Sequence, residues 1–362
     1  MGLLRGADQG SMRQSGRVAA GGVRAGGLKP AWRRNNASDL LNTDFREVLM
    51  SVIKAVDLAY GRLRSPDLDK QEEFLTAFGM VRADRTKTAL YMRGTDSPHH
   101  IHVTELGAPK YVGIALHAGS LEDLEKLART PGASPVESID EPGGGKRVRL
   151  TDPDGFQVEI VHGMAQLPKI AVARPAVNIG EDKTRRRNAL YRVERGPSHV
   201  KRIGHFVVHS PQFEKTLGWY RDMLGFRCSD EVYADKKENL VGSFNRLDRG
   251  DDYVDHHVFF CIRSDKAGLN HLSYEAADMD DIMIGHEHLV EKGYEHFWGI
   301  GRHSLGSQVF DYWGDPWGRV HEHWADTDVL NASVPANLWG RGELGGPWGE
   351  APPERFMHHA VA

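Results

Sequence analysis

Histidine is unevenly distributed along this chain. Of its 19 histidines, five precede residue 198 and 14 follow it. Imidazole is the commonest metal ligand in proteins and exchanges protons near neutral pH, so this distribution predicts metal or acid–base chemistry in the second half. The two cysteines, Cys228 and Cys261, are too few for a disulfide framework or a cysteine-built zinc site. A reducing, cytoplasmic setting is therefore expected.

Three residues of the second half stand on three separate predicted strands and could bind one metal ion: His205, His271 and Glu322. Two neutral imidazoles and one carboxylate on one face of a metal leave three positions open, which is typical of non-haem Fe(II) oxygen chemistry. Glu322 lies between His321 and His323, and strand alternation puts it on one face and both histidines on the other. Spacing alone leaves open which of these faces points inward.

The two halves of the chain repeat one order of short strands and short helices. Residues 152–159 (DPDGFQVE) align with residues 315–322 (DPWGRVHE), and the Asp, Pro and Gly of the turn and the final Glu coincide. A repeat on this scale decides the architecture, which we expect to be an α+β fold of tandem βαβββ modules. The alignment places Tyr60, Gly113 and Glu159 opposite the three possible ligands. The first half therefore cannot bind a metal in the same way.

Local patterns predict the elements that carry these residues. Strands are expected at 52–59, 89–92, 100–104, 111–117, 147–150, 156–161, 202–208, 258–262, 271–275, 307–313 and 319–324. Helices are expected at 67–78, 121–128, 212–224 and 279–292. A five-residue loop at 313–317 would pair Tyr312 with Gly318 and Glu322 with Gln308. In that register Tyr312 and Glu322 face the same side of the hairpin.

The chain divides into five expected segments. These are a flexible basic tail at 1–45, a metal-free N-terminal domain at 46–167, a linker at 168–198, a metal-binding catalytic domain at 199–330 and a C-terminal tail at 331–362. The first 34 residues contain six arginines and one lysine against one acidic residue, and such a composition favours disorder. In the last segment, residues 339–348 could cover the active site or pack on a neighbouring subunit.

The composition argues against two classes of partner. The formal net charge is −4, from 46 basic and 50 acidic residues, so there is no basic field that would attract nucleic acid. No run approaches the roughly 20 apolar residues that span a bilayer, so no membrane partner is expected.

Six segments of the second half form a joint motif: NHLSYE (270–275), DDI (280–282), WGIGRH (298–303), GSQVFDYW (306–313), DPWG (315–318) and EHWAD (322–326). This motif resembles the type I extradiol ring-cleavage dioxygenases of the vicinal oxygen chelate superfamily, such as catechol 2,3-dioxygenases and 2,3-dihydroxybiphenyl 1,2-dioxygenases. The resemblance is dense from about 199 to 328 and weaker, but in register, from about 50 to 165. It implies two domains of the glyoxalase/bleomycin-resistance type.

The resemblance also implies roles for particular residues. The three possible ligands would hold Fe(II), with Mn(II) as the alternative, and the catalytic residues would be His256, His303 and Tyr312. His256 matches a family histidine 15 residues before the second ligand, and His257 is its rival if the register shifts by one. The implied activity is extradiol (meta) cleavage of a substituted catechol with O2 in aromatic catabolism. A homo-oligomer is also expected.

One dipeptide of the second half departs from the pattern of the related enzymes, and one histidine cluster of the first half lies outside the implied site. Leu305 and Gly306 replace an Asn-Asp pair of the dihydroxybiphenyl enzymes, which argues against a dihydroxybiphenyl substrate. His99, His100 and His102 form a cluster in the first half. Their spacing makes a poor shared site, so a solvated or interface cluster is expected.

Three other functions stay open on the same residues. A 4-hydroxyphenylpyruvate dioxygenase-like oxygenase would use the same ligands but does not need His256, His303 and Tyr312. A glyoxalase-like isomerase or lyase usually draws metal ligands from both repeats, and Tyr60 and Gly113 cannot supply them. A non-catalytic metal- or ligand-binding protein would bind iron without consuming O2.

Overall fold

The structure, a computed structural model, describes residues 51–362, so the expectations for residues 1–45 lie outside the described part. All of the described residues belong to one compact unit. Among them, no helix combines the length and the apolar character that crossing a membrane would require.

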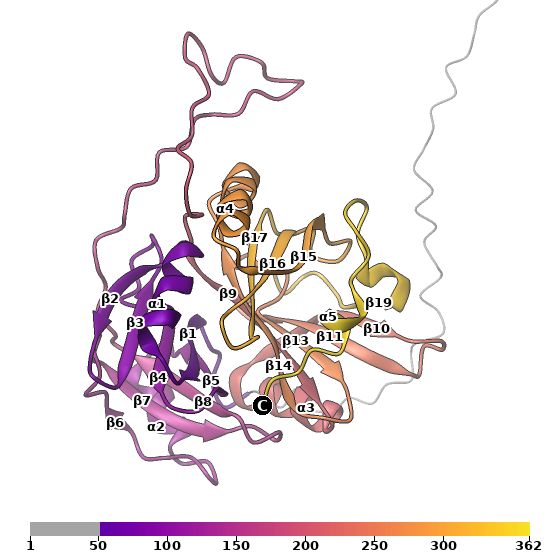
Figure 1. Cartoon of the computed structure of the whole chain (residues 1–362). Helices are drawn as coiled ribbons and strands as arrows, with labels where there is room; N and C mark the ends of the chain where they lie inside the picture. Colours follow the sequence, from indigo (N-terminus) through magenta and orange to yellow (C-terminus); the bar gives the residue numbers. More distant parts are fainter. Residues whose placement is uncertain (1–50) are drawn as a thin grey trace, which may run out of the picture. The chain divides into compact units, whose positions relative to one another are not determined.

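The first large sheet has eight strands in the order β2-β3-β4-β1-β5-β8-β7-β6 (Figure 1). In chain order its region contains β1 (Asp57–Ser65), α1 (Leu68–Ala77), β2 (Val81–Arg85), β3 (Ala89–Arg93), β4 (His102–Leu106), β5 (Lys110–His117), α2 (Leu121–Leu127), β6 (Glu137–Ser138), β7 (Lys146–Thr151) and β8 (Gln157–His162).

The second large sheet has nine strands in the order β15-β16-β17-β14-β9-β13-β11-β10-β19. Its region contains β9 (Arg202–Ser210), α3 (Phe213–Leu224), β10 (Phe226–Tyr233), β11 (Leu240–Leu247), β13 (Phe259–Arg263), β14 (Gly268–Glu275), α4 (Met279–Glu291), β15 (Glu295–Arg302), β16 (Val309–Gly314), β17 (Val320–Ala325) and β19 (Asn337–Gly340). Strands β12 (Val254–Asp255) and β18 (Val329–Leu330) pair separately, and η1 (Arg341–Leu344) and α5 (Glu354–Met357) lie near the C-terminus.

The two large sheets share one topology, as the sequence repeat predicts. When β1 is matched to β9 and β5 to β14, the eight strands of the first sheet follow the same order in the second, and β19 is added beside β10. Each sheet is built from two βαβββ units, of which the first sheet has β1-α1-β2-β3-β4 and β5-α2-β6-β7-β8. The predicted α+β class with tandem βαβββ modules is confirmed, with two units in each sheet.

Strand β1 begins and ends later than the predicted range 52–59. Its second half carries Arg62, which an apolar pattern does not assign to a buried strand. Arg62 is nevertheless buried because its guanidinium lies 3.0 Å from Glu105, 2.8 Å from Glu141 and 3.3 Å from Glu159. Buried charges of this kind are tolerated when they are paired.

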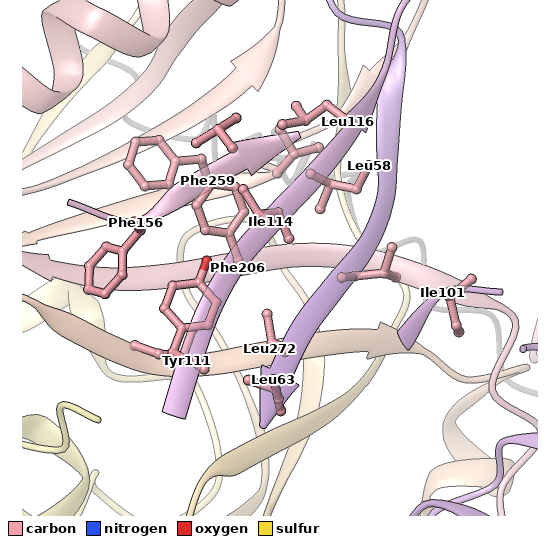
Figure 2. Close-up of a cluster of buried hydrophobic side chains, with 14 of the residues drawn as sticks. Leu58, Leu63, Ile101, Tyr111, Ile114, Leu116, Phe156, Phe206, Phe259 and Leu272 are labelled. Carbon is pink, nitrogen blue, oxygen red and sulfur yellow. The ribbon is translucent and has the colours of Figure 1, made fainter. Parts of the chain in front are cut away.

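One hydrophobic cluster contains side chains from both large sheets (Figure 2). Leu63 and Ile114 come from the first sheet, and Phe206 and Leu272 from the second. A Cβ atom at Gly61 would lie 2.4 Å from Cδ1 of Leu272, so glycine permits the close approach at this point. The first sheet thereby packs against the strands β9 and β14 that carry two of the predicted ligands.

A buried arginine adds a polar connection between the two halves. Arg319 follows β16 in the chain and donates to Asp315 at 2.7 Å, to Ser65 at 2.7 Å and to Gln71 at 2.6 Å. Ser65 and Gln71 belong to the first half, and all four side chains are buried. Arg319 therefore couples the turn before β17 to the end of β1.

Replacing Arg319 with Met should destabilise the protein by about 3–5 kcal/mol, because Asp315 would then be a buried charge without its partner. The midpoint of chemical denaturation measures this loss. Arg64→Met is the matched control, since Arg64 is largely exposed and its ion pair with Glu105 should contribute no more than about 1 kcal/mol. Equal effects of the two substitutions would contradict the role assigned to Arg319.

Candidate metal centre

The three predicted ligands converge on one face of three neighbouring strands. His205 lies on β9, His271 on β14 and Glu322 on β17. The Nε2 of His205 is 2.8 Å from Oε2 of Glu322, and the Nε2 of His271 is 3.3 Å from that oxygen and from Nε2 of His205. The three donor atoms thus surround one point, and all three residues are buried.

This set of donors fits a divalent transition-metal ion. Separations of this size are expected between ligands that bind one ion at about 2.0–2.2 Å. Burial would raise the pKa of Glu322, but the neighbouring His205 and His271 outweigh it and hold that pKa well below its usual range. The carboxylate is therefore ionised. The Nδ1 of His271 lies 2.7 Å from Oδ1 of Asn270, which orients the ring so that Nε2 is the nitrogen left to bind.

The pairing of the strands explains this convergence. Glu322 pairs with Ser273 across β17 and β14, and Ser273 pairs with His205 across β14 and β9. His271 lies two residues before Ser273 and therefore shares its face of the sheet. The small side chain of Ser273 leaves the space between the three ligands open.

The histidines on either side of Glu322 point to the opposite face. The ring of His323 stacks on Phe78 with centroids 3.7 Å apart, and its Nε2 donates to the carbonyl oxygen of Phe78 at 2.6 Å. His321 lies 3.5 Å from Asp315. Of the two faces that the sequence left open, the one bearing Glu322 thus carries the candidate metal centre.

The matching positions of the first sheet hold a different arrangement. Strand register places Tyr60, Gly113 and Glu159 where the second sheet has its three ligands. The Tyr60 hydroxyl hydrogen-bonds to Glu159, and the guanidinium of Arg62 lies 3.3 Å from the same carboxylate. A protein cation therefore compensates the buried carboxylate in this sheet.

His303 and Tyr312 lie together beside the three ligands. The Nε2 of His303 is 2.9 Å from the Tyr312 hydroxyl and 3.9 Å from Oε1 of Glu322. Burial lowers the pKa of His303 to about 4, so its ring is neutral near pH 7. Both side chains line the cavity above the ligands.

The predicted register of the β16–β17 hairpin was wrong. Tyr312 pairs directly with Glu322, and Gly314 pairs with Val320. The turn lies later than expected because Asp315 accepts hydrogen bonds from the backbone N–H groups of Trp317 and Arg319 at 2.9 and 3.0 Å. Direct pairing still places Tyr312 and Glu322 on the same face.

Of the two adjacent histidines, His256 and His257, the structure places the second at the cavity. His256 points away from the cavity, and its Nε2 lies 2.7 Å from Asp230. His257 lines the cavity instead, with its ring centroid 4.4 Å from that of His205. The two histidines contact each other through their Nδ1 atoms at 3.1 Å. The structure therefore does not bring His256 together with His303 and Tyr312, because its side chain is directed to Asp230.

A cavity of about 420 Å³ opens above the ligands. Apolar side chains supply most of its wall, among them Val207, Val241, Phe244, Phe260 and Leu305. The arginine and glutamate side chains that line it are exposed: Arg263, Arg341, Glu343 and Glu354. Their charges cancel, and Arg263 is already paired with Glu214. The interior is therefore suited to an uncharged, apolar group.

The C-terminal segment covers one side of this cavity. Leu344 and Phe356 line it, and the Phe356 ring lies 4.6 Å from the ring of Tyr312. The side-chain amide of Asn270 donates to the Phe356 carbonyl at 3.1 Å and fixes this segment beside His271. Of the two alternatives for residues 339–348, the structure supports covering of the site.

Two residues of the site were absent from the sequence-based set. Asn270 directly precedes a predicted ligand, and that position was the available signal for it. Phe356 lies in a segment without apolar periodicity, so its sequence gave no signal.

Of the histidine cluster in the first half, only His99 is partly exposed. His100 and His102 are buried, and the Nδ1 of His102 lies 2.7 Å from the hydroxyl of Tyr274 on β14. Burial lowers the pKa of His100 to about 3 and that of His102 well below its usual range, so both rings are neutral. His102 thus forms a hydrogen bond between the two sheets, whereas His100 packs against Tyr60 and Tyr91 of the first sheet.

Comparisons with known proteins agree with this arrangement. Residues 202–320 match the family described as Glyoxalase/Bleomycin resistance protein/Dioxygenase superfamily. The chain is 29% identical to metapyrocatechase 2 of Cupriavidus necator over 310 residues, which cover 83% of this chain and 91% of that protein. It is 25% identical to a manganese-dependent 2,3-dihydroxybiphenyl 1,2-dioxygenase of Geobacillus genomosp. 3 (70% and 79% covered) and to an iron-dependent extradiol dioxygenase of Rhodococcus jostii strain RHA1 (78% and 95%).

Solved structures share the fold. The Mn(II)-bound glyoxalase from Novosphingobium aromaticivorans has a TM-score of 0.70 at 23% identity, covering 85% of this chain and 96% of that one. Homoprotocatechuate 2,3-dioxygenase from Brevibacterium fuscum also has a TM-score of 0.70, at 18% identity, covering 87% and 94%. Together these comparisons confirm the resemblance to extradiol dioxygenases of the vicinal oxygen chelate superfamily. They also support the expectation that the chain is an enzyme, and the names of two relatives state a dependence on manganese and on iron, respectively.

Proposed function

We propose that this enzyme uses Fe(II), bound by His205, His271 and Glu322, to cleave a catechol that carries an uncharged, apolar substituent. O2 is the second substrate, both of its atoms enter the product, and the ring opens beside the two hydroxyl groups. The observation that carries the proposal is a buried two-histidine, one-carboxylate set at the base of a mainly apolar cavity. Residues 199–330 form the catalytic domain in this proposal, and residues 46–167 the metal-free domain.

The metal and the protein have separate tasks. A bound Fe(II) ion would supply positions for the catechol oxygens and for O2 and would lower the pKa of the catechol hydroxyls. His303 and Tyr312 hydrogen-bond the substrate oxygens and hold the ring in place, because their polar atoms lie 2.9 Å apart beside Glu322. The apolar wall excludes water from the reacting groups.

His257 moves a proton in this proposal. Asp230 accepts from Nε2 of His256, which leaves the Nδ1 of His256 as an acceptor for the Nδ1–H of His257. The Nε2 of His257 is then unprotonated and available to the cavity. It can accept a catechol proton and return it during ring opening.

Anaerobic loading of the protein with Fe(II), followed by a catechol panel and O2, tests the activity. A yellow ring-fission product with one O2 consumed per catechol is expected, and Mn(II)-loaded protein tests the choice of metal. Bound iron without colour or O2 uptake would favour a non-catalytic protein. O2 uptake with 4-hydroxyphenylpyruvate instead of catechols would favour a 4-hydroxyphenylpyruvate dioxygenase-like oxygenase.

We also propose that the protein is a homo-oligomer, and light scattering would measure its molar mass in solution.

The apolar cavity predicts the choice of substituent. An alkyl-substituted catechol should have a kcat/KM at least about 100-fold above that of 3,4-dihydroxyphenylacetate, because a carboxylate would lose its hydration without gaining a cation. Steady-state O2 uptake measures both values on one preparation. Equal values would contradict the apolar substituent while leaving catechol cleavage intact.

A further inference from the structure

A second group of possible metal ligands lies on the other face of the second sheet. His286 comes from α4, His296 from β15 and Asp311 from β16. Asp311 precedes Tyr312 in the same strand, so the two side chains point to opposite faces. This group therefore belongs to the layer between the sheet and α4, and the cavity above the first metal centre does not include it.

The donor atoms of this group have the spacing of a coordination site. The Nε2 of His296 is 2.8 Å from Oδ1 of Asp311, and the Nδ1 of His286 is 3.2 and 3.1 Å from the two carboxylate oxygens. A single N–H donating to a carboxylate is usually closer to one oxygen, at about 2.7–2.9 Å. The nearly equal distances from His286 lie within the 2.8–3.3 Å range of the separations between donor atoms at the first centre.

The surroundings hold the carboxylate and leave one side open. The indole N–H of Trp313 donates to Oδ2 of Asp311 at 2.5 Å, the kind of outer contact that orients a ligating carboxylate. Asp311 is fully buried, whereas the side chains of His286 and His296 are 24% and 31% exposed. An ion between them would therefore keep positions that face water.

We infer that His286, His296 and Asp311 form a second metal site that binds a divalent ion of the zinc class. Two imidazole nitrogens and one carboxylate are the ligands that Zn²⁺ accepts together with water, whereas Mg²⁺ and Ca²⁺ prefer oxygen donors alone. The bound ion would connect α4, β15 and β16.

The test replaces nitrogen ligands with amides that keep the hydrogen bonds. An Asn amide can replace Nδ1 of His286 and a Gln amide Nε2 of His296, so H286N/H296Q preserves donors to Asp311 while removing both imidazoles. H288N is the control, because His288 is on the same helix outside the group. Full-length protein is equilibrated with Zn²⁺, and bound zinc is counted by elemental analysis.

Wild-type protein and H288N should each bind one more zinc ion per chain than H286N/H296Q. Any zinc bound at the first centre is the same in all three proteins and does not affect this difference. Equal zinc contents in all three proteins would overturn the inference and leave a hydrogen-bonded trio. If the double variant does not fold, Co²⁺ titration of the wild type decides. Two bound equivalents support the second site, and one equivalent overturns it.

Discussion

Replacing Glu322 with Gln is expected to lower metal affinity at least about 100-fold and to abolish ring cleavage at ordinary metal concentrations. The substitution keeps the volume of the side chain but removes the single negative charge among the three ligands. Two neutral imidazoles then face a buried divalent ion without a compensating carboxylate, which is costly. Elemental analysis after gel filtration gives the metal content, and O2 uptake gives the turnover.

Glu159→Gln provides the matched control. Glu159 occupies the same position of the first sheet, is equally buried and is compensated by Arg62 in place of a metal. This variant should keep its full metal content, although it loses stability because Arg62 is left with fewer acceptors. If Glu322→Gln kept its metal while Glu159→Gln lost it, the assignment of the centre to the second sheet would be wrong.

The repeat identified three possible ligands from the sequence because they lie at related positions of its two halves, and the resemblance to a known family was needed to choose Glu322 over its neighbours. His205, His271 and Glu322 each stand on a strand whose counterpart has Tyr60, Gly113 or Glu159, and strand alternation separates Glu322 from its histidine neighbours. Periodicity of two is a local property, so it could be applied before any tertiary contact was known.

The features that the sequence did not predict depend on contacts across the chain. Arg62 lies in a buried strand only because three glutamates from distant segments compensate it, and local patterns cannot reveal such pairing. Phe356 reaches the cavity because Asn270 holds its carbonyl oxygen. The register of the β16–β17 hairpin was missed because Asp315 caps its own turn, and the partner of Tyr312 lies four residues later than expected, at Glu322.

The choice between His256 and His257 likewise depends on contacts with distant parts of the chain. One step of register decides which imidazole faces the cavity, and the sequence around them, Asp-His-His-Val, does not distinguish the two. The two histidines are distinguished by the interaction of His256 with Asp230. Trp339 of the C-terminal segment also donates to Asp230, at 2.8 Å. His256 therefore belongs to a network that holds β19 and orients its neighbour.

Replacing His257 with Ala should leave the metal content unchanged and lower kcat by about 10²–10⁴-fold, the range for loss of a proton-transferring side chain. Its Nε2 is the imidazole nitrogen that the network leaves free to exchange a proton with the substrate. Single-turnover measurement of ring-fission product under saturating catechol and O2 separates this step from binding. Loss of metal from His257→Ala would instead make His257 a ligand.

Replacing His256 with Ala should have a smaller effect on kcat than the His257 substitution, by at least about tenfold, because His256 acts only by holding the tautomer of its neighbour. His256→Gln should recover part of the rate, since a Gln amide can still donate to Asp230. A purely structural role would lower thermal stability in both variants without this recovery of kcat. If His256→Ala lowered kcat more than His257→Ala, the proton would pass through His256. His256, and not His257, would then have to face the cavity.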